Sequence, residues 1–397
     1  MDDSYSSAHP PLPPTTEDDR VSRLRLLRSR RVGVTTFWRL MDEHGTAAAA
    51  LEALPEVARA AGTDNYQACT EASALAEMAE ARRAGARMLF RGEKGYPSDL
   101  SALTDAPPFL WVIGETAALD RPMVALVGAR NASSLGTRMA RRLAEELGEA
   151  GFVVVSGLAR GIDTAAHLAA LDTGTVAVMA GGVDMIYPPE NARLADDIVA
   201  RGGARVSEQP MGVQPQARHF PTRNRIVAGL ARGVVVVEAA AKSGSLITAR
   251  LALDIGREVL AVPGHPLDAR AGGCNILIRD GARLVRGAQD VLEALPPAEA
   301  QAALPLAMPD ADRRELHRLR EPAQAPVQAP EERTLRDSAR LHDAIIARLG
   351  PSPIAEDQLI RDLGATAGHV APVLTDLELD GRVLRQPGGL LSLLPPA

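Results

Sequence analysis

The sequence has little cysteine, few aromatic residues and no long apolar run. Its two cysteines, Cys69 and Cys274, lie far apart among 397 residues, which excludes a disulfide framework and the paired ligands of a zinc site. No stretch approaches the roughly 18–20 apolar residues of a membrane span. Residues 1–20 are polar, acidic and proline-rich, unlike a signal or transit peptide. We expect no membrane span, a cytoplasmic location and a disordered tail over residues 1–20.

Catalytic and cofactor-binding motifs are also missing. The chain has no GxxxxGK[ST] loop, and its first glycine turn lacks the G-x-G-x-x-G spacing of dinucleotide sites. The histidines are dispersed, and Ser156 and Ser243 have no evident His/Asp partners that would make them nucleophiles. Asp163 and His167, four residues apart, could mimic an acid–base pair, but we expect Asp163 to stabilise a helix start. We predict no cofactor, no metal and no catalysis.

The net charge of −6 is unevenly distributed. Residues 121–290 contain 20 Lys+Arg and 16 Asp+Glu, so this segment carries +4 and the remainder carries −10. Only Lys94 and Lys242 are lysines, and every other of these cations is arginine. The central segment can therefore attract an anionic partner although the whole chain is acidic.

Residues 86–295 show an alternation of short apolar runs and helical stretches. This order predicts an α/β domain, a Rossmann-like fold with a doubly wound, mostly parallel sheet, because the runs are apolar throughout, as in strands buried on both faces. Helices are expected between the strands, for example at 136–150 and 246–256. Strands are expected at residues 123–128, 152–157, 175–180, 204–209, 233–239, 258–264 and, more weakly, 282–285.

The flanking segments predict further domains. Over residues 21–85, a helix capped by Thr35 or Thr36 and ended by Gly45 precedes a helix capped by Thr46 that ends near Pro55. This order resembles a SAM-like or helix-hairpin-helix module, and either a packing role or a DNA-binding role remains open.

The C-terminal part of the chain begins with a segment that has the composition of a linker. Residues 296–335 hold seven prolines, typical of a Pro/Ala-rich linker, and residues 336–397 predict a winged helix. Its third helix has no Lys or Arg across residues 365–380, which favours protein docking or autoinhibition over groove reading.

The candidate site lies in the loops after the strands, because ligands of an open parallel sheet bind beyond the carboxyl ends of its strands. These loops place Gly or Ser at helix starts, where free N–H groups and the helix dipole favour an anion. Several also bring a cation, so we predict a site for an extended phosphate backbone. The candidate residues are Gly128, Arg130 and Ser133 after the first expected strand, Ser156, Gly157, Arg160, Gly161 and Asp163 after the second, Phe220, Arg223, Asn224 and Arg225 after the fourth, and Lys242, Ser243, Gly244 and Ser245 after the fifth.

Phe220 is the only aromatic residue that we assign to these loops. Proteins that bind single strands usually stack bases on aromatic rings. Phe220 can therefore serve as a stacking platform, or it can simply pack the loop onto the sheet. The sequence leaves both interpretations open.

Several of these loops also resemble the motifs of a known family. The segments are VGARNASSLG, SGLARGIDTAAH, RHFPTRNRIVAGL, VVVVEAAAKSGSLITARLALDIGREVLAVPG and GGCNILIRDGARL. They are long, follow in order and are similar to the successive motifs of the DprA family, also called Smf. The resemblance covers most of residues 85–295, and an N-terminal SAM-like domain and a C-terminal winged helix accompany this core in many members.

The resemblance implies a function in DNA processing and recombination. Members bind single-stranded DNA in a basic pocket, form homodimers through the Rossmann-like domain and load the recombinase RecA onto incoming strands during natural transformation. By motif match, Arg130 and the segment 220–225 correspond to DNA-contacting positions, and Ser243, Gly244 and Ser245 would complete the pocket. No established enzymatic activity comes with the family.

Two other functions compete with this interpretation. A Rossmann-like nucleotide-binding enzyme of the phosphoribohydrolase type has a similar sheet, but residues 262–265 (VPGH) lack the rest of its PGGxGTxxE pattern. A non-enzymatic nucleotide sensor would bind a mononucleotide tightly and would be indifferent to the length of an oligonucleotide.

Overall fold

A computed structural model of the chain describes Pro13, Pro14 and residues 16–295, 344–349, 354–363, 370, 374, 383–386 and 390–393. The chain divides into two compact units, residues 1–304 and 305–397, and each is described by itself. In the described residues, no helix has both the length and the apolar character needed to cross a membrane.

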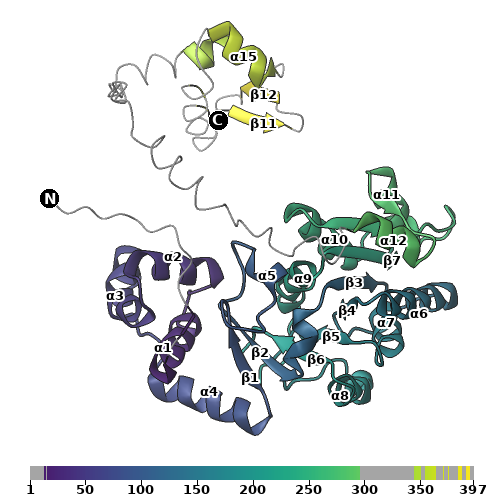
Figure 1. Cartoon of the computed structure of the whole chain (residues 1–397). Coiled ribbons are helices and arrows are strands. Elements are labelled where there is room, and N and C mark those ends of the chain that lie inside the picture. The colour runs from purple at the N-terminus through teal and green to yellow at the C-terminus, as the bar shows by residue number, and fades with distance from the viewer. Residues whose placement is uncertain are drawn as a thin grey trace, which may run out of the picture. The chain divides into compact units, whose positions relative to one another are not determined.

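The first unit is built on a sheet with the order β1-β2-β6-β5-β4-β3-β7-β8-β9 (Figure 1). All seven expected strands are confirmed, and they run parallel to one another. They are β3 (Met123–Gly128), β4 (Val153–Ser156), β5 (Thr175–Val178), β6 (Ala204–Ser207), β7 (Gly233–Glu238), β8 (Glu258–Ala261) and β9 (Arg283–Leu284).

Two strands were not anticipated from the sequence. β1 (Arg87–Phe90) pairs antiparallel with β2 (Phe109–Gly114), and β2 pairs antiparallel with β6. The short helix α5 (Ser98–Ser101) lies between them in the chain. The sequence does not show this pair as a hairpin, because a hairpin is recognised by a turn of a few residues between two strands and this connection is much longer. The sheet is therefore mixed.

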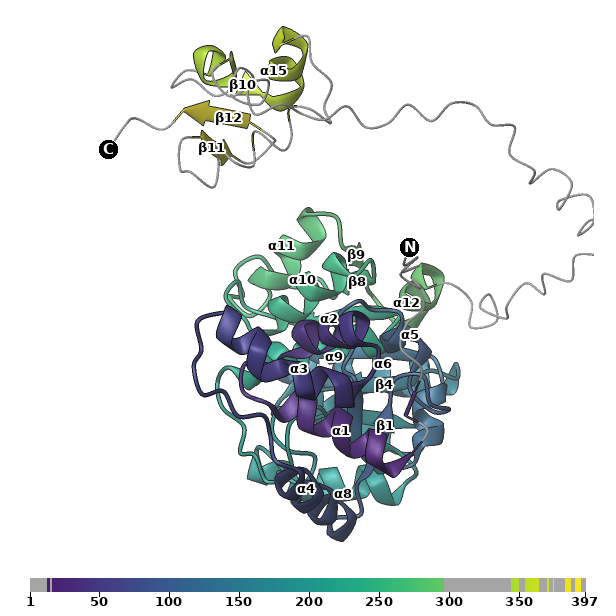
Figure 2. The same ribbon diagram turned by 90° about the vertical axis from the view of Figure 1, so that its left-hand side faces the viewer.

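Helices cover both faces of the parallel strands, as a doubly wound sheet requires (Figures 1 and 2). Ala125 and Val127 belong to one buried cluster and Val124 and Leu126 to another, because successive strand residues point to opposite faces. Helices α9 (His219–Leu230), α10 (Ser245–Asp254) and α11 (Gly272–Arg279) cover the first face, and α6 (Ser134–Glu149), α7 (Ile162–Ala169) and α12 (Ala288–Ala294) cover the second. Helix α8 (Ala192–Ala200) packs on β5.

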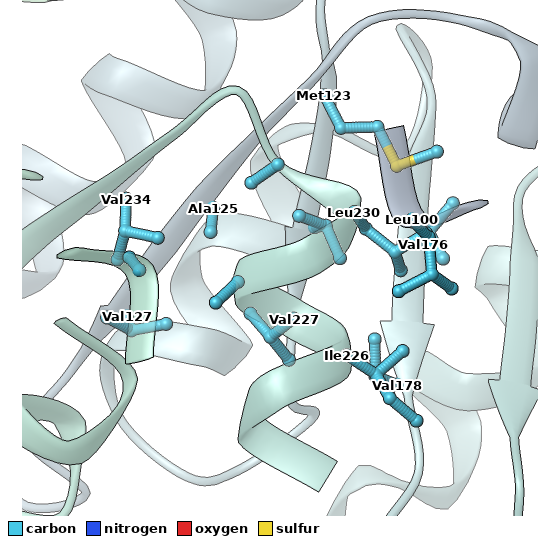
Figure 3. Close-up of a cluster of buried hydrophobic side chains, with 14 of the residues drawn as sticks. Leu100, Met123, Ala125, Val127, Val176, Val178, Ile226, Val227, Leu230 and Val234 are labelled. Carbon is cyan, nitrogen blue, oxygen red and sulfur yellow. The ribbon is translucent and has the colours of Figure 1, made fainter. Parts of the chain in front are cut away.

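Helix α9 positions the candidate site. Figure 3 shows Ile226, Val227 and Leu230 of this helix packed on strand residues such as Val127 and Val178. All of these side chains are buried, and burying one apolar side chain of this size contributes about 1.5–3 kcal/mol. The C-terminal half of α9 is thereby fixed on the sheet, and its first turns lie above the strand ends.

The N-terminal helices are α1 (Glu17–Arg28), α2 (Val34–His44), α3 (Ala47–Ala60) and α4 (Glu71–Arg83). Gly45 ends α2 with a φ of 74°, and the Thr46 hydroxyl accepts a hydrogen bond from the Ala49 N–H at the start of α3, as expected. Three other expectations are wrong, and each has a local cause.

The expectation of disorder is wrong for residues 16–20. The Thr16 hydroxyl accepts a hydrogen bond from the Asp19 N–H, and helix α1 begins at Glu17. Neither Thr35 nor Thr36 caps α2, which begins at Val34 after Gly33. Helix α3 continues through Pro55 to Ala60. Val57 packs on the same buried cluster as the residues before Pro55, so apolar packing continues past the proline.

The N-terminal helices and the sheet share one core. Val21 and Leu24 of α1 and Met78 of α4 lie in the same buried cluster as Phe109 and Trp111 of β2. Residues 21–85 and 86–295, which differ in sequence character, therefore form one compact unit.

The second unit contains the expected wing. Strands β10 (Ile354–Ala355), β12 (Leu390–Leu393) and β11 (Val383–Gln386) pair antiparallel in that order, and α15 (Glu356–Leu363) follows β10. The expected linker over residues 296–335 and most of the acidic third helix over 365–380 lie outside the described residues.

Candidate nucleic-acid interface

A cavity of about 770 Å³ lies at the carboxyl ends of the central strands. Its wall comes from the loop after β3, the loop after β4, the first turns of α9 and the loop between β7 and α10. Most of the expected site residues meet here. They are Gly128, Arg130, Gly157, Asp163, Phe220, Arg223, Asn224, Lys242, Ser243, Gly244 and Ser245.

Two of the expected phosphate-binding positions are already filled by carboxylates of the chain itself. At the start of α6, the Ser133 hydroxyl and N–H both donate to Glu238, the N–H at 3.0 Å. In the loop after β4, the N–H groups of Gly157 and Ala159 donate to one oxygen of Asp163, at 3.0 and 3.3 Å. Ser133 and Asp163 therefore organise the loops, and these amides are not free to bind a phosphate.

The start of α10 is more open. Ser243 and Ser245 join their hydroxyls at 2.8 Å, and the cap residue Gly244 has no side chain. Lys242 is exposed on the same turn, and the ion pairs of the described residues do not include it. A helix start with an adjacent ammonium group is a suitable place for a phosphate.

Arg130 is an exposed cation of the loop after β3 that also lines the cavity. Its guanidinium carbon lies 5.0 Å from the centroid of the Phe220 ring, a cation–π contact that restrains the side chain over the cavity. Arg223 lies 6.0 Å from the same centroid. Arg130 is exposed to solvent, so its guanidinium can form a direct pair with a phosphate oxygen.

Arg223 is a buried cation in the floor of the cavity. Its Nη1 donates to the Val178 carbonyl at 3.0 Å, and its side chain crosses Gly157 so closely that a Cβ there would lie 1.5 Å from Nη1. Only glycine at position 157 leaves this space. Burial lowers the pKa of Arg223 to about 10 against the raising effect of Asp163, so the group stays charged at neutral pH.

Asp163 and His167 do not form an acid–base pair in the cavity. Burial raises the pKa of Asp163, although Arg223 and the two loop amides lower it. His167 is fully buried, its pKa falls to about 3 through desolvation, and its Nδ1 lies 2.7 Å from the Thr175 hydroxyl. Asp163 thus has a structural role, but it accepts from the loop amides that precede α7 and not from the helix start that the sequence predicted.

The remaining candidates lie outside the main cavity. Arg160 lines a smaller adjoining hollow, together with Arg130, Tyr187 and Phe220. The Ser156 hydroxyl is buried and donates to the Leu126 carbonyl at 2.7 Å. Gly161 has a φ of 77°, and a Cβ there would lie 2.2 Å from the Ala129 carbonyl, so it permits two loops to pack closely.

Arg225 points away from the cavity, contrary to expectation. Its guanidinium pairs with Glu208 and donates to the Asp105 carbonyl at 2.6 Å. It is two residues from Arg223, and positions two apart on a helix face different directions. Both arginines were equally good candidates from the sequence, and only the packing of the folded chain distinguishes them.

Sequence reasoning missed Arg270 and Tyr187. Arg270 lines the main cavity from the segment between β8 and α11 and pairs with Asp268 at 3.3 Å. Tyr187 lines the adjoining hollow from the loop after β5 and makes an edge contact with Phe220. An aromatic residue in a loop that follows a strand was the available signal for Tyr187.

The sequence also matches known protein families. The family described as DNA recombination-mediator protein A matches residues 87–296, more than half of the chain. The chain belongs to the DprA/Smf family. The DprA-like N-terminal HHH domain matches residues 17–80, and the DprA winged helix domain matches residues 329–389. The expected family and order of domains are thereby confirmed.

Individual DprA/Smf proteins agree with this assignment. Protein Smf of Escherichia coli is 40% identical over 300 residues, which cover 75% of each chain. The DNA processing protein DprA of Streptococcus pneumoniae is 49% identical over 199 residues, 50% of this chain and 70% of that protein. The X-ray structure of DprA from Streptococcus pneumoniae matches with a TM-score of 0.59 and 35% identity, covering 71% of this chain and 99% of that one.

Proposed function

We propose that this chain binds single-stranded DNA through the cavity at the strand ends and acts as a recombination mediator. The observation that carries the proposal is the set of cations that line one cavity: exposed Arg130, Lys242 and Arg270, and buried Arg223. Asp163 is the acidic side chain that lines the same cavity, so the wall carries a net positive charge.

The cavity selects an unpaired strand by its shape. Its volume is that of a small-ligand pocket, which a flexible strand can enter and a duplex is too wide to enter. Arg130 can hold a phosphate by two parallel hydrogen bonds, and the α10 start can hold another. Contacts of this kind fix the backbone and carry no sequence information, so we expect DNA of any sequence to bind.

The proposal assigns binding, and not catalysis, to this site. Among the described residues that line the cavity, Asp163 is occupied by two amides and His167 does not reach the wall. No group of three or more potential metal-ligating residues gathers among the described residues. The charged groups of the cavity can therefore position a phosphate chain, and we propose no bond cleavage.

Substitution of Arg130 tests the function directly. We expect Arg130→Ala to weaken binding of a labelled dT oligonucleotide about tenfold or more, because a hydrogen bond to a charged group contributes about 1.5–3 kcal/mol. The slope of log affinity against log salt should become shallower by about 0.7, the value of one phosphate contact on single strands. Fluorescence anisotropy at several salt concentrations measures both quantities.

Competitors distinguish this function from the alternatives. A duplex should compete poorly, and a mononucleotide should compete far less well than the oligonucleotide. Equal competition by the mononucleotide would instead indicate a nucleotide sensor, and release of a free base from it would indicate a phosphoribohydrolase. Lys94→Ala is a matched control, because Lys94 is absent from the wall of the cavity.

We further propose that the bound strand is passed to RecA, as in natural transformation. The support is the family description as a recombination mediator. The same Arg130→Ala variant should delay RecA assembly on single-stranded DNA in proportion to its lost affinity. The rate of DNA-dependent ATP hydrolysis by RecA, with the strand precoated by a single-strand binding protein, measures this delay.

A homodimer is the third part of the proposal. Leu253 of α10, Ile276 of α11 and Leu284 of β9 are exposed apolar side chains, as is Leu267, which is 90% exposed. These elements neighbour one another around β8 and the β9 edge of the sheet, and apolar side chains gathered at one place favour association.

The dimer is tested by its mass in solution. We expect wild-type protein to have the light-scattering mass of two chains, and Leu253→Glu/Ile276→Glu to have the mass of one, because the charges would be desolvated in the interface. Leu168→Glu is the control, an exposed leucine on α7. A monomeric wild type at all concentrations would contradict this part.

A further inference from the structure

We infer that Tyr187 is a ring on which this protein stacks a DNA base. The inference rests on the proposed single-stranded DNA binding and names a subsite for it. The subsite is the surface over the small hollow, of about 10 Å³, that Arg130, Arg160, Tyr187 and Phe220 line next to the main cavity.

The exposure of Tyr187 is the first observation. Among the described residues, it is the only aromatic side chain whose exposure places it with the exposed large apolar groups, at 45%. The contacts of the described residues include no hydrogen bond to its hydroxyl. A tyrosine normally contributes to stability by burial or through its hydroxyl, so the exposed position of this ring calls for another reason.

The loop that carries Tyr187 is firmly anchored. Ile186 packs against a buried cluster that contains Leu158 and Met179. The Asn191 side-chain amide donates to the Leu158 carbonyl at 2.9 Å. Tyr187 is therefore an exposed ring on a fixed support, which lowers the entropy lost when a base stacks on it.

Phe220 is differently placed. It is only partly exposed, and the guanidinium groups of Arg130 and Arg223 lie over its ring at 5.0 and 6.0 Å. The Tyr187 ring meets it at 5.9 Å with an interplanar angle of 63°. Through these three contacts Phe220 holds Arg130 and supports Tyr187, while it also lines both hollows.

The small hollow adjoins the main cavity, because the two share part of their wall. Arg130, Gly157, Ala159 and Phe220 line both of them. Arg160 lines only the smaller hollow, and its exposed side chain lies 3.8 Å from the exposed Glu190 carboxylate. A strand that leaves the main cavity past Arg130 would place a phosphate near Arg160 and the adjoining base against Tyr187.

A strand without bases separates stacking from phosphate binding. We compare a labelled dT oligonucleotide with an abasic strand of the same length, using wild-type protein and Tyr187→Ala. The variant should bind dT about 5- to 150-fold more weakly, the range for one stacked base. It should bind the abasic strand as well as wild type does, with the same salt dependence, because no phosphate contact is lost.

Further variants identify the part of the side chain that acts. Tyr187→Phe should bind dT as wild type does, because the ring is kept. Tyr187→Trp should show a change of tryptophan emission on binding dT and none with the abasic strand, since Trp38 and Trp111 are buried. Phe220→Ala should weaken binding of both strands, because Arg130 loses its support.

The outcomes are distinct. Equal affinity of wild type and Tyr187→Ala for dT, or an equal loss on both strands, would overturn the stacking role while the proposed function stands. Failure of wild-type protein to bind either strand would overturn the proposed function and this inference together.

Discussion

Replacing Arg223 with leucine is expected to lower the free energy of unfolding by about 3 kcal/mol at pH 8, the scale for leaving a buried charge uncompensated. Arg223 is 7% exposed and Asp163 6% exposed. Without Arg223, the desolvated Asp163 carboxylate has only neutral hydrogen-bonding groups to stabilise its charge. Denaturant unfolding of wild type and variant measures the difference.

The sign of the pH dependence follows from Asp163. Burial already raises the pKa of this carboxyl and Arg223 opposes the rise, so the variant raises the pKa further. A carboxyl with a higher pKa in the folded state binds more protons folded than unfolded, and stability then falls as pH rises. The variant should therefore lose most relative to wild type at pH 8, and less as pH falls through the pKa of folded Asp163.

A second substitution provides the control. Arg223→Leu/Asp163→Asn keeps an oxygen that can accept from the Gly157 and Ala159 N–H groups but has no buried charge, so it should recover part of the lost stability at pH 8. An Arg223→Leu variant that loses the same free energy at pH 5 and pH 8 would contradict the role of Asp163. The recovered double variant should still bind DNA weakly, because the cation in the cavity floor is gone.

Arg225→Ala is expected to destabilise the fold by a similar amount, about 3 kcal/mol, without changing the DNA affinity of the folded protein. Arg225 pairs with Glu208, whose carboxylate is 10% exposed. Burial raises the pKa of Glu208, and Arg225 and Arg28 lower it. Loss of Arg225 raises this pKa further, so the destabilisation should again be larger at pH 8 than at pH 5.

The two arginines thus give opposite results in the binding assay. Anisotropy at a temperature where both variants are folded should show weak binding by Arg223→Leu/Asp163→Asn and normal binding by Arg225→Ala. Arg225→Ala/Glu208→Gln should regain stability, because it has no unpaired buried charge. Reduced affinity and a shallower salt slope for Arg225→Ala would show that this residue reaches the strand after all.

The Glu208 site also explains why the N-terminal helices belong to the same unit as the sheet. Arg28 of α1 forms an ion pair with Glu77 of α4 at 2.8 Å and donates to the Glu208 carbonyl at 3.2 Å. The Trp111 N–H of β2 donates to Glu77 at 2.9 Å. A polar network at the edge of a shared apolar core fixes the orientation of the packed elements. Arg225 of α9 joins this network, while the first turns of the same helix line the cavity.

The parallel core could be predicted from the sequence, because its signals are local. Fully apolar runs such as 123–128 and 233–239 must be buried on both faces, and Gly or Ser after such a run marks the start of a helix. The position of the site at the strand ends follows from the topology alone. The antiparallel pair β1 and β2 was missed because its strands are far apart in the chain.

Tertiary structure alone decided what each site residue does. From the sequence, Ser133, Asp163, Arg223 and Arg225 were assigned to one phosphate site. In the structure, Glu238 accepts from the start of α6 and Asp163 accepts from the loop amides. Arg225 pairs with Glu208 outside the cavity. These partners are distant in the chain, and a charged side chain finds its partner only when packing brings the two together. The sequence by itself determined the fold, the edge of the sheet where the site lies and the family; the direction of each side chain, and the exposed ring of Tyr187 beside the cavity, depended on contacts between elements that no local pattern records.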